Sequence, residues 1–202
     1  MTQDITEEFE PLGIKCTDTD CENGLHCFRQ KEKLRAAGRE GRCRACGVEL
    51  IDWERLRSHD LEDIEFIFAS LRYELIRHAF WHTNIDPKAI NHARRKGRRG
   101  MREAAEKRLR KYVGPENPSF DGRQTPKSGN IIFYAQHATA ACCRACVEQW
   151  HGFPKGRDLT DDEIAYLTEL VFRYIVERLP DLTEEGEKVP PISRRRASGE
   201  ER

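Results

Sequence analysis

A chain of 202 residues with 35% charged and only 38% hydrophobic residues has a mean hydropathy of −0.78. It can bury one sizeable core, and its low apolar content favours helices with narrow apolar stripes over a parallel sheet buried on both faces. The net charge is zero, because 35 basic residues balance 35 acidic ones. Any preference for a charged partner must therefore come from how charge is distributed along the chain.

The N-terminal region and the apolar segments give no sign of membrane targeting. Residues 1–15 form an acidic, polar lead-in without the apolar run of a signal peptide, and no stretch approaches the roughly 18 uninterrupted apolar residues of a membrane span. We therefore expect a cytoplasmic protein with no membrane partner. In that reducing compartment we expect the eight cysteines to act as metal ligands rather than to form disulfides.

A cysteine-rich segment at residues 16–53 predicts a small zinc-ribbon-like β module. Two residues separate Cys43 from Cys46, which turns both thiolates toward one point, and Gly47 allows the positive φ that follows such a turn. The turn-forming sequence TDTD separates two further cysteines that can supply the remaining ligands. The predicted first zinc site is Cys16, Cys21, Cys43 and Cys46.

The residues from Gly24 to Gln30 fit a strand that leads away from this site. On such a strand Leu25 and Cys27 share one face, and His26 lies on the other. Cys27 is then a buried core thiol, or it replaces Cys16 as the fourth ligand. The alternative without metal is a set of free, buried cysteines. Five cysteines within 31 residues of a small polar segment could not otherwise build a core, which favours the metal site.

The strongest helix pattern begins near Ser58 or Asp60, either of which can act as N-cap. Apolar residues then recur at alternating spacings of three and four, at Leu61, Ile64, Phe68, Leu71 and Leu75. The stripe continues to His78 and His82, one turn apart on the inward face, which is half of a common metal site. A zinc-protease motif also needs a glutamate after the first histidine, where the chain has Ala79. The alternative is a pair of core histidines satisfied by hydrogen bonds.

Residues 88–111 carry eleven lysines and arginines against two glutamates. Small and apolar residues mark one stripe of this basic helix, and such a helix is the usual electrostatic footprint of contact with DNA or RNA. Gly97 and Gly100 weaken the helix and allow the backbone to bend or to approach a phosphate. The predicted nucleic-acid contacts are Arg94, Arg95, Lys96, Arg98, Arg99 and Arg102. The alternative is solvated charge, or pairing with acidic helices of the same chain.

A loop containing prolines and glycines follows at residues 113–130, and its length suggests that it is functional or covers a site. Residues 130–134 then predict a short strand. A helix is expected from Thr139 to Trp150, with Gly152 as its stop.

Three cysteines at spacings of three and four lie on this predicted helix, so that pairs of them face one point, and His137 and His151 flank it. Together with the earlier histidine pair they form a set of nitrogen and sulfur ligands suited to zinc. The predicted second metal site uses a subset of His78, His82, His137, Cys142, Cys143 and Cys146.

The segment YAQHATAACCRACVEQWHGFPKGRDLT, with the later ELVFRYIVERL, resembles the signature of a bacterial and phage family of unknown function. The resemblance extends over residues 60–180, and it leaves the cysteine-rich N-terminus as an extension that only some members carry. It implies an intact domain but no reaction. The matching positions are Tyr134, His137, Cys142, Cys143, Cys146, Trp150, His151 and Gly152.

The C-terminal part of the chain is structural. Thr160 and Glu163 fit a capping box, and an amphipathic helix follows that Pro180 terminates. The charged, proline-containing residues 181–202 predict a disordered tail. The expected fold is therefore mainly α, with a helical domain at residues 54–180 between the cysteine-rich module and the tail.

The function favoured by these patterns is a protein that binds one or two zinc ions and contacts DNA or RNA through its basic helix. Zinc is favoured over an iron–sulfur cluster because histidines accompany the cysteines. One alternative is a metal-dependent enzyme acting on nucleic acid or nucleotides, with Glu148 or His151 as general base. The glutamate that follows the ligand histidine in cysteine-rich deaminases is absent, since Thr139 and Asn84 stand there. The other alternative is a metal-stabilised helical scaffold for a protein partner.

Overall fold

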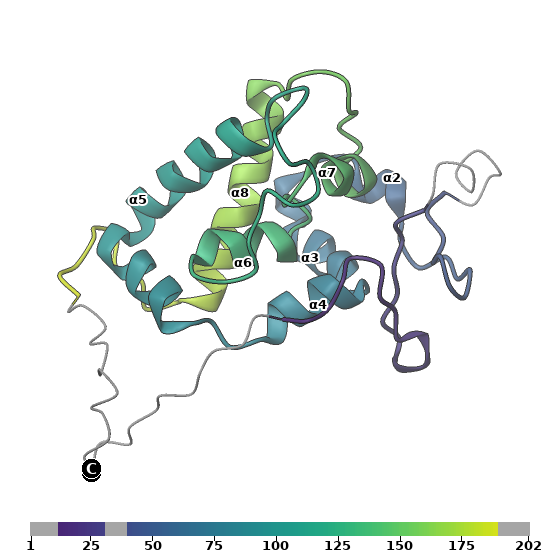
Figure 1. Ribbon diagram of the computed structural model, residues 1–202, viewed down its shortest axis with the longest axis horizontal. Helices are drawn as coiled ribbons and strands as arrows, with labels where there is room; N and C mark the ends of the chain where they lie inside the picture. Colours follow the sequence, from purple (N-terminus) through teal and green to yellow (C-terminus); the bar gives the residue numbers. More distant parts are fainter. Residues whose placement is uncertain (1–11, 31–39, 190–202) are drawn as a thin grey trace, which may run out of the picture.

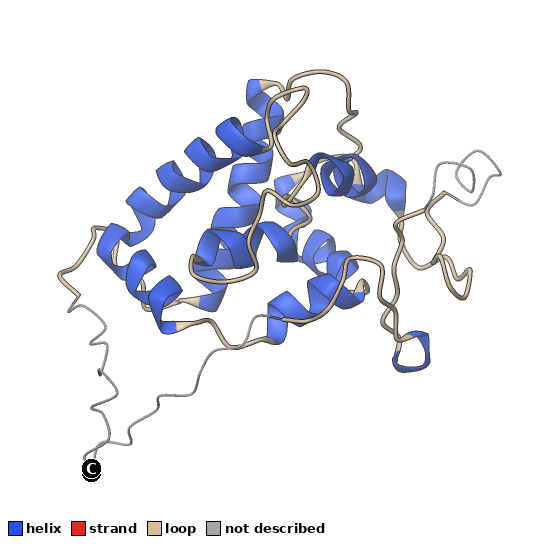
Figure 2. Ribbon diagram, in the orientation of Figure 1, coloured by secondary structure: helices blue, strands red, loops and turns tan. Residues whose placement is uncertain are grey.

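The computed structural model describes residues 12–30 and 40–189, and these are mainly helical, as predicted (Figure 1, Figure 2). The α-helices are α2 (Trp53–Leu56), α3 (Ile64–Arg72), α4 (Leu75–His82), α5 (Pro87–Tyr112), α6 (Ile131–Ala138), α7 (Arg144–His151) and α8 (Asp161–Arg178). Two short 3-10 helices, η1 (Cys21–Asn23) and η3 (Leu61–Asp63), precede α2 and α3 respectively.

The predicted β module is not seen in the described part of the cysteine-rich segment. That part holds η1 and two isolated backbone bridges, one between Asp20 and Leu25 and one between His26 and Glu74. The second bridge explains the difference, because the extended backbone at His26 pairs with the helical domain instead of forming a hairpin. Residues 31–39, and with them the middle of the predicted module, lie outside the described residues.

One hydrophobic core unites the helices. In Figure 1, α8 and α6 run through the centre, with α5 along one side and α3, α4 and α7 on the other. α8 packs against α5 and α6, and α4 packs against α6 and α3. The capping box predicted at Thr160 and Glu163 is present and starts α8. Phe80, Met101 and Tyr174 are fully buried where α4, α5 and α8 meet the core.

The long helix predicted from the stripe that ends at His82 is broken between α3 and α4. Glu74 adopts an extended conformation with φ −88° and ψ 125°. The backbone on either side of Glu74 pairs with His26 through N–H···O bonds of 2.7 and 2.9 Å. The break changes the helical register, so the stripe does not continue inward to His78. The buried face of α4 is Ile76, Arg77, Phe80 and Trp81.

The short strand predicted at residues 130–134 is instead the first part of α6. Asn130 accepts a hydrogen bond from the Ile132 N–H at 3.0 Å and caps this helix. The predicted helix from Thr139 begins later, at Arg144, because Ala140 has a positive φ of 56°. Its predicted end is confirmed, since Gly152 forms a left-handed C-cap with φ 71°.

The basic helix α5 bends at Gly97, whose φ of 66° and ψ of 179° interrupt the helical path. Part of the predicted tail is ordered at this bend. Arg98 and Arg99 donate their backbone N–H groups to the carbonyls of Thr183 and Glu184 at 2.8 and 3.2 Å. The tail is therefore not disordered at these positions, and residues 190–202 lie outside the described residues.

An aromatic cluster docks the N-terminal segment onto the helical domain. Phe28 makes edge contacts with Trp53 of α2 and Trp150 of α7, at centroid distances of 5.9 and 5.8 Å, and the two tryptophans lie 5.2 Å apart. Phe28 is fully buried and belongs to the same hydrophobic core as the helices. The described N-terminal residues thus share the core of the helical domain.

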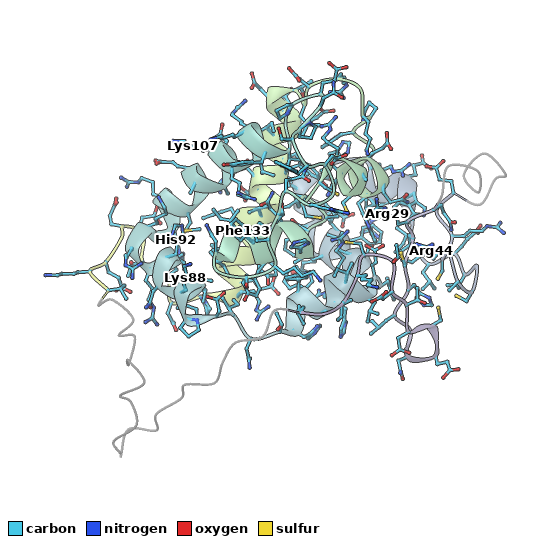
Figure 3. The ribbon with its side chains drawn as sticks, in the orientation of Figure 1. Arg29, Arg44, Lys88, His92, Lys107 and Phe133 are labelled. Atoms are coloured by element: carbon cyan, nitrogen blue, oxygen red, sulfur yellow. The ribbon has the colours of Figure 1, made fainter. Side chains whose placement is uncertain are left out.

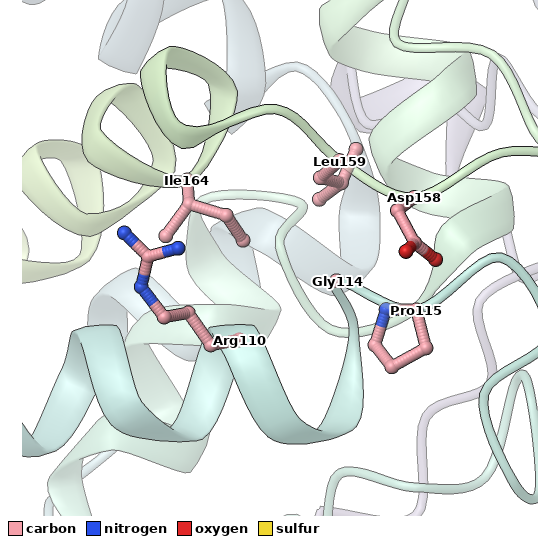
Figure 4. A pocket seen from close by; sticks show the side chains of 6 residues that line it. All are labelled: Arg110, Gly114, Pro115, Asp158, Leu159 and Ile164. Carbon is pink, nitrogen blue, oxygen red and sulfur yellow. The ribbon is translucent and has the colours of Figure 1, made fainter.

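The end of α5 and the turn before α8 line a surface pocket (Figure 4). Leu159 donates its N–H to Gly114 O at 2.8 Å, and this hydrogen bond joins the two segments that line the pocket. The six residues that line the pocket include none of the site residues predicted from the sequence. This pocket is therefore separate from the cysteine clusters described below.

Candidate metal centres

Four potential ligands gather in the N-terminal segment. The sulfur atoms of three cysteines and one ring nitrogen of His26 all lie within 4.8 Å of one another, and we call this set the first cluster: Cys21, His26, Cys43 and Cys46. Cys21 Sγ is 3.8 Å from Cys43 Sγ, and Cys46 Sγ is 3.5 Å from His26 Nδ1. The first cluster could hold a metal ion.

Local backbone structure brings these ligands together. The turn at Cys43 is closed by the Gly47 N–H, which donates to Cys43 O at 2.9 Å, and Gly47 has the predicted positive φ, 80°. Cys21 starts η1, which ends at a left-handed Gly24. The bridge between His26 and the backbone around Glu74 fixes the histidine relative to the helical domain. The first cluster is therefore anchored to the core on its histidine side.

The first cluster differs from the predicted ligand set in one position. His26 occupies the place expected for Cys16, which is not part of the cluster. Sequence reasoning placed His26 on the strand face opposite Leu25 and Cys27, and no local pattern marked it as a ligand. Cys27, the predicted alternative ligand, is a buried thiol that donates to Cys16 O at 3.2 Å.

The electrostatic surroundings of Cys43 favour the form that binds metal. Burial tends to raise its pKa, but hydrogen bonds from the backbone of Cys27, Cys46 and Ala45 and from His26 lower the pKa to about 6. A thiol with this pKa is largely a thiolate at neutral pH, and the thiolate is the metal ligand.

A second cluster lies at the start of α7. The three sulfur atoms of Cys142, Cys143 and Cys146 are within 4.8 Å of one another and are buried, and this second cluster could also hold a metal ion. Cys143 is the N-cap of α7, and Cys146 lies in its first turn. The helix N-terminus carries partial positive charge, which favours thiolates there. The loop at 113–130 covers this cluster, as Thr125 donates its hydroxyl to Cys142 O at 2.8 Å.

A fully buried arginine, Arg77 of α4, donates to the second cluster. Its guanidinium reaches Cys146 Sγ at 3.1 Å and Cys142 Sγ at 3.8 Å. Hydrogen bonds from the Cys142 and Cys143 thiols, with the positive charges of Arg77 and Arg29, hold the pKa of Cys146 well below its usual range despite burial. Arg77 therefore gives the buried Cys146 sulfur a positive partner.

Glu74 connects Arg77 to the N-terminal segment. Its carboxylate accepts hydrogen bonds from Arg77 Nε at 3.0 Å, Trp150 Nε1 at 3.0 Å and the Phe28 N–H at 3.2 Å. Since His26 of the first cluster is bridged to the backbone of the same Glu74, a short path of contacts joins the two clusters.

The predicted histidine ligands of the second site are not brought into the second cluster. His78 and His82 stack on each other with ring centroids 4.0 Å apart, and His82 is exposed. His137 is buried, its ring stacks on Phe80 at 4.6 Å, and its Nε2 donates to Thr125 O at 3.1 Å. The cause is the break at Glu74, which turns the histidine pair away from the core.

The two candidate general bases, Glu148 and His151, each form a hydrogen bond with the backbone of a neighbouring segment. His151 is fully buried and donates Nε2–H to Thr139 O at 2.9 Å. Glu148 accepts a hydrogen bond from the Lys155 N–H at 3.1 Å. Both contacts stabilise the ends of α7 and the loop after it.

Acidic partners accompany several of the basic residues predicted to contact nucleic acid. Arg99 pairs with Glu185 at 2.6 Å, Arg102 with Glu169 at 2.5 Å, and the Arg94 and Glu187 side chains lie 3.8 Å apart. Arg98 donates to Pro180 O at 2.8 Å. The positions of Arg95 and Lys96 are exposed, and Figure 3 labels other polar positions along this helix at Lys88, His92 and Lys107.

A family model described as Domain of unknown function (DUF4186) matches residues 65–176 of the chain. This range includes the second cluster and excludes the first. No solved structure matches the chain. None of the helices in the described part of the protein is long and apolar enough to cross a membrane. The family match spans more than half of the chain, and the protein therefore belongs to the DUF4186 family, whose domain has no assigned function.

Proposed function

We propose that this protein binds zinc at the first cluster and uses the ion to hold its N-terminal segment in shape. One observation carries the proposal: three sulfur atoms and one imidazole nitrogen lie within 4.8 Å of one another. Three cysteines with one histidine are a usual ligand set for structural zinc, which is four-coordinate and tetrahedral. Such a set leaves no open position for substrate, so a structural role is favoured over catalysis at this cluster.

A zinc ion would join parts of the segment that lie apart in the sequence. Cys43 and Cys46 lie on one turn, and Cys21 lies on η1 before the extended residues at His26. Because the unfolded chain lacks a formed site, the free energy of zinc binding contributes to folding. Removing zinc would therefore loosen the residues around Cys21, Cys43 and Cys46 while leaving the core of helices α3 to α8.

Matched histidine variants test this proposal. His26→Ala removes a ligand of the first cluster, whereas His82→Ala removes an exposed histidine outside both clusters. We expect His26→Ala to contain one zinc ion per chain fewer than the wild type by elemental analysis, and His82→Ala to match the wild type. Equal zinc content in His26→Ala and the wild type would contradict the proposal.

A second candidate function is contact with DNA or RNA through α5. The favouring observation is that Arg94, Arg99 and Arg102 keep about half of their side-chain surface exposed despite their pairing, with values of 53%, 62% and 47%. Arginines arranged along one helix displace counterions from phosphates, so binding should weaken steeply as salt increases. Filter binding to single- and double-stranded DNA and RNA at two salt concentrations tests this function. Absent or salt-insensitive binding to all of them would count against it.

A further inference from the structure

We propose that Cys16 completes a second metal centre as the fourth ligand beside Cys142, Cys143 and Cys146. The centre would fasten the N-terminal segment directly to the DUF4186 domain. This inference goes beyond the zinc proposed at the first cluster and does not depend on it, because the two clusters share no ligand.

The second cluster alone offers three thiols, one fewer than a closed tetrahedral site requires. Cys16 and Cys146 line the same narrow crevice, together with the guanidinium groups of Arg29 and Arg77. Figure 3 shows Arg29 in the N-terminal segment, on the side of the molecule that carries α7. A thiol from a segment distant in sequence thus lines the same crevice as Cys146 of the second cluster.

Hydrogen bonds hold the backbone of the segment that carries Cys16. Cys27 donates to Cys16 O at 3.2 Å, and Lys127 Nζ donates to Leu12 O at 2.8 Å. The Cys16 sulfur is not within 4.8 Å of all three sulfurs of the second cluster. A cysteine has three staggered χ1 positions, so a change of rotamer can move the sulfur toward a bound ion without moving the backbone.

The charges around the crevice suit a metal held by four thiolates. Such a zinc centre has a net charge of minus two, which is costly to bury without positive partners. Arg29 and Arg77 line the crevice and place two positive charges there, and Glu74, which also lines it, pairs with Arg77 at 3.0 Å. Arg77 also donates to two sulfurs of the second cluster, as groups behind metal ligands commonly do.

The competing fourth ligand is His137, whose Nδ1 is buried without a hydrogen-bond partner. Its ring is fixed by stacking on Phe80 and by the hydrogen bond to Thr125 O, at a place where its nitrogens lie outside the second cluster. To turn toward the ion, the ring would have to give up both contacts. Cys16 is therefore the better candidate.

Cysteine variants of the full-length protein test the inference. We compare Cys16→Ser with Cys27→Ser, which also removes one cysteine but lies outside both clusters, and with His137→Gln. Each purified variant is loaded with zinc and titrated with a chromophoric chelator. Cys16→Ser should release one of its two zinc ions at least about tenfold more readily than the wild type, while Cys27→Ser and His137→Gln should not.

A fourth variant covers the possibility that Cys16→Ser misfolds. Cys16→His keeps a ligand at this position, so it should retain the second metal. Its cobalt-substituted form should show weaker sulfur-to-cobalt absorption than the wild type, because one thiolate is replaced by nitrogen. Wild-type affinity in Cys16→Ser, an unchanged cobalt spectrum in Cys16→His, or selective zinc loss in His137→Gln would overturn the inference. The His26→Ala variant reports separately on the first cluster.

Discussion

At the scale of single residues, the buried pair of Glu74 and Arg77 ties the two clusters together. Both side chains are 2% exposed, and the carboxylate accepts hydrogen bonds from the buried donors Arg77 Nε, Trp150 Nε1 and Phe28 N–H. A buried charge whose partner is removed is strongly destabilising, because the remaining charge has neither water nor a counterion. The pair therefore determines whether α4, α7 and the N-terminal segment fit together.

We expect Arg77→Met to destabilise the protein by about 3–5 kcal/mol, since it leaves the Glu74 carboxylate uncompensated. Urea unfolding followed by circular dichroism measures the change. Arg110→Met is the control, because Arg110 pairs with Asp161 and Glu106 on the exposed surface, where no comparable loss is expected. Similar stability of the two variants would show that the buried pair contributes little.

The buried His151 predicts that the protein is sensitive to acid. Burial lowers the pKa of His151 from 6.5 to about 4, and its Nδ1 has no partner that could accept a second proton. Above pH 6.5 the ring is neutral in both states and contributes no pH dependence. Between about pH 6.5 and 4 the unfolded chain binds a proton that the folded chain does not, so stability falls, by up to about 3 kcal/mol.

The wild type and His151→Gln separate this effect from other titrations. Glutamine can still donate to Thr139 O but does not titrate. The difference in unfolding free energy between the two proteins should therefore shrink, or change sign, as the pH falls from 7 to 4.5. A difference that is constant over this range would rule out His151 as a source of acid sensitivity.

The residues of the first cluster show what sequence spacing can and cannot predict. The knuckle at Cys43 and Cys46, with its left-handed glycine, depends on local backbone geometry, and the spacing predicted it. The choice between His26 and Cys16 depends on a bridge to Glu74, which is distant in the sequence. Spacing contains no information about that contact.

At the scale of elements, the bend in α5 and the ordered part of the tail depend on each other. A Cβ atom at Gly97 would clash with the backbone of Glu185, and the φ of 66° is unfavourable for residues with a side chain. Glu187 also donates its N–H to Arg94 O at 2.9 Å. The bend frees backbone N–H and C=O groups of α5 from the helical hydrogen-bond pattern, and the tail forms hydrogen bonds with them.

Gly97→Ala should therefore release the tail from α5 and destabilise the protein by about 1–3 kcal/mol. Gly100→Ala, in a regular part of the same helix where the nearest atom is Lys96 Cβ at 3.2 Å, should change stability by less than about 1 kcal/mol. Thermal unfolding and the protease sensitivity of the tail measure both effects. Equal behaviour of the two alanine variants would contradict the role assigned to the bend.

The tail also predicts how α5 would bind nucleic acid. Glu185 and Glu187 lie beside Arg99 and Arg94, so they compete with phosphates for the same guanidinium groups. The double variant Glu185→Gln with Glu187→Gln should bind nucleic acid more tightly than the wild type. Its salt dependence should also be steeper, by a slope of up to about 2.

The control for this prediction is a double variant that removes the same two negative charges away from the tail. Glu54→Gln with Glu62→Gln alters two exposed positions on α2 and η3, away from the tail. Binding measured at several salt concentrations should distinguish the pairs. If both double variants gained affinity to the same extent, net charge and not the tail would be responsible.

Several elements could not be placed from periodicity because a tertiary contact overrides it. The apolar stripe predicted one helix through His82, but pairing with His26 extends the backbone at Glu74 and splits it. The run beginning at Ile131 has the β-branched and aromatic residues of a strand, yet the Asn130 cap and burial on all sides give a helix. Where the signal is local, as in the capping box of α8, the prediction is confirmed.

At the scale of the whole molecule, the N-terminal segment and the DUF4186 domain share one core. Composition and periodicity predicted a mainly helical protein, because amphipathic stripes are visible in the sequence. They also predicted a separate module, because the cysteine-rich segment looks polar on its own. Its burial depends on Phe28 meeting two tryptophans from other elements, a contact that no local pattern reveals.

We propose that two metal ions bind this chain, one at each cluster. Elemental analysis of the purified wild type, Cys43→Ser and Cys146→Ser, expressed with zinc and without chelators, tests it most directly. We predict two zinc ions per chain in the wild type and one in each variant, because each substitution removes a ligand of a different cluster. If the wild type held one zinc ion and only Cys43→Ser lost it, the first cluster would be a metal site and the second would not. A wild-type protein without stoichiometric metal would contradict metal binding at both clusters.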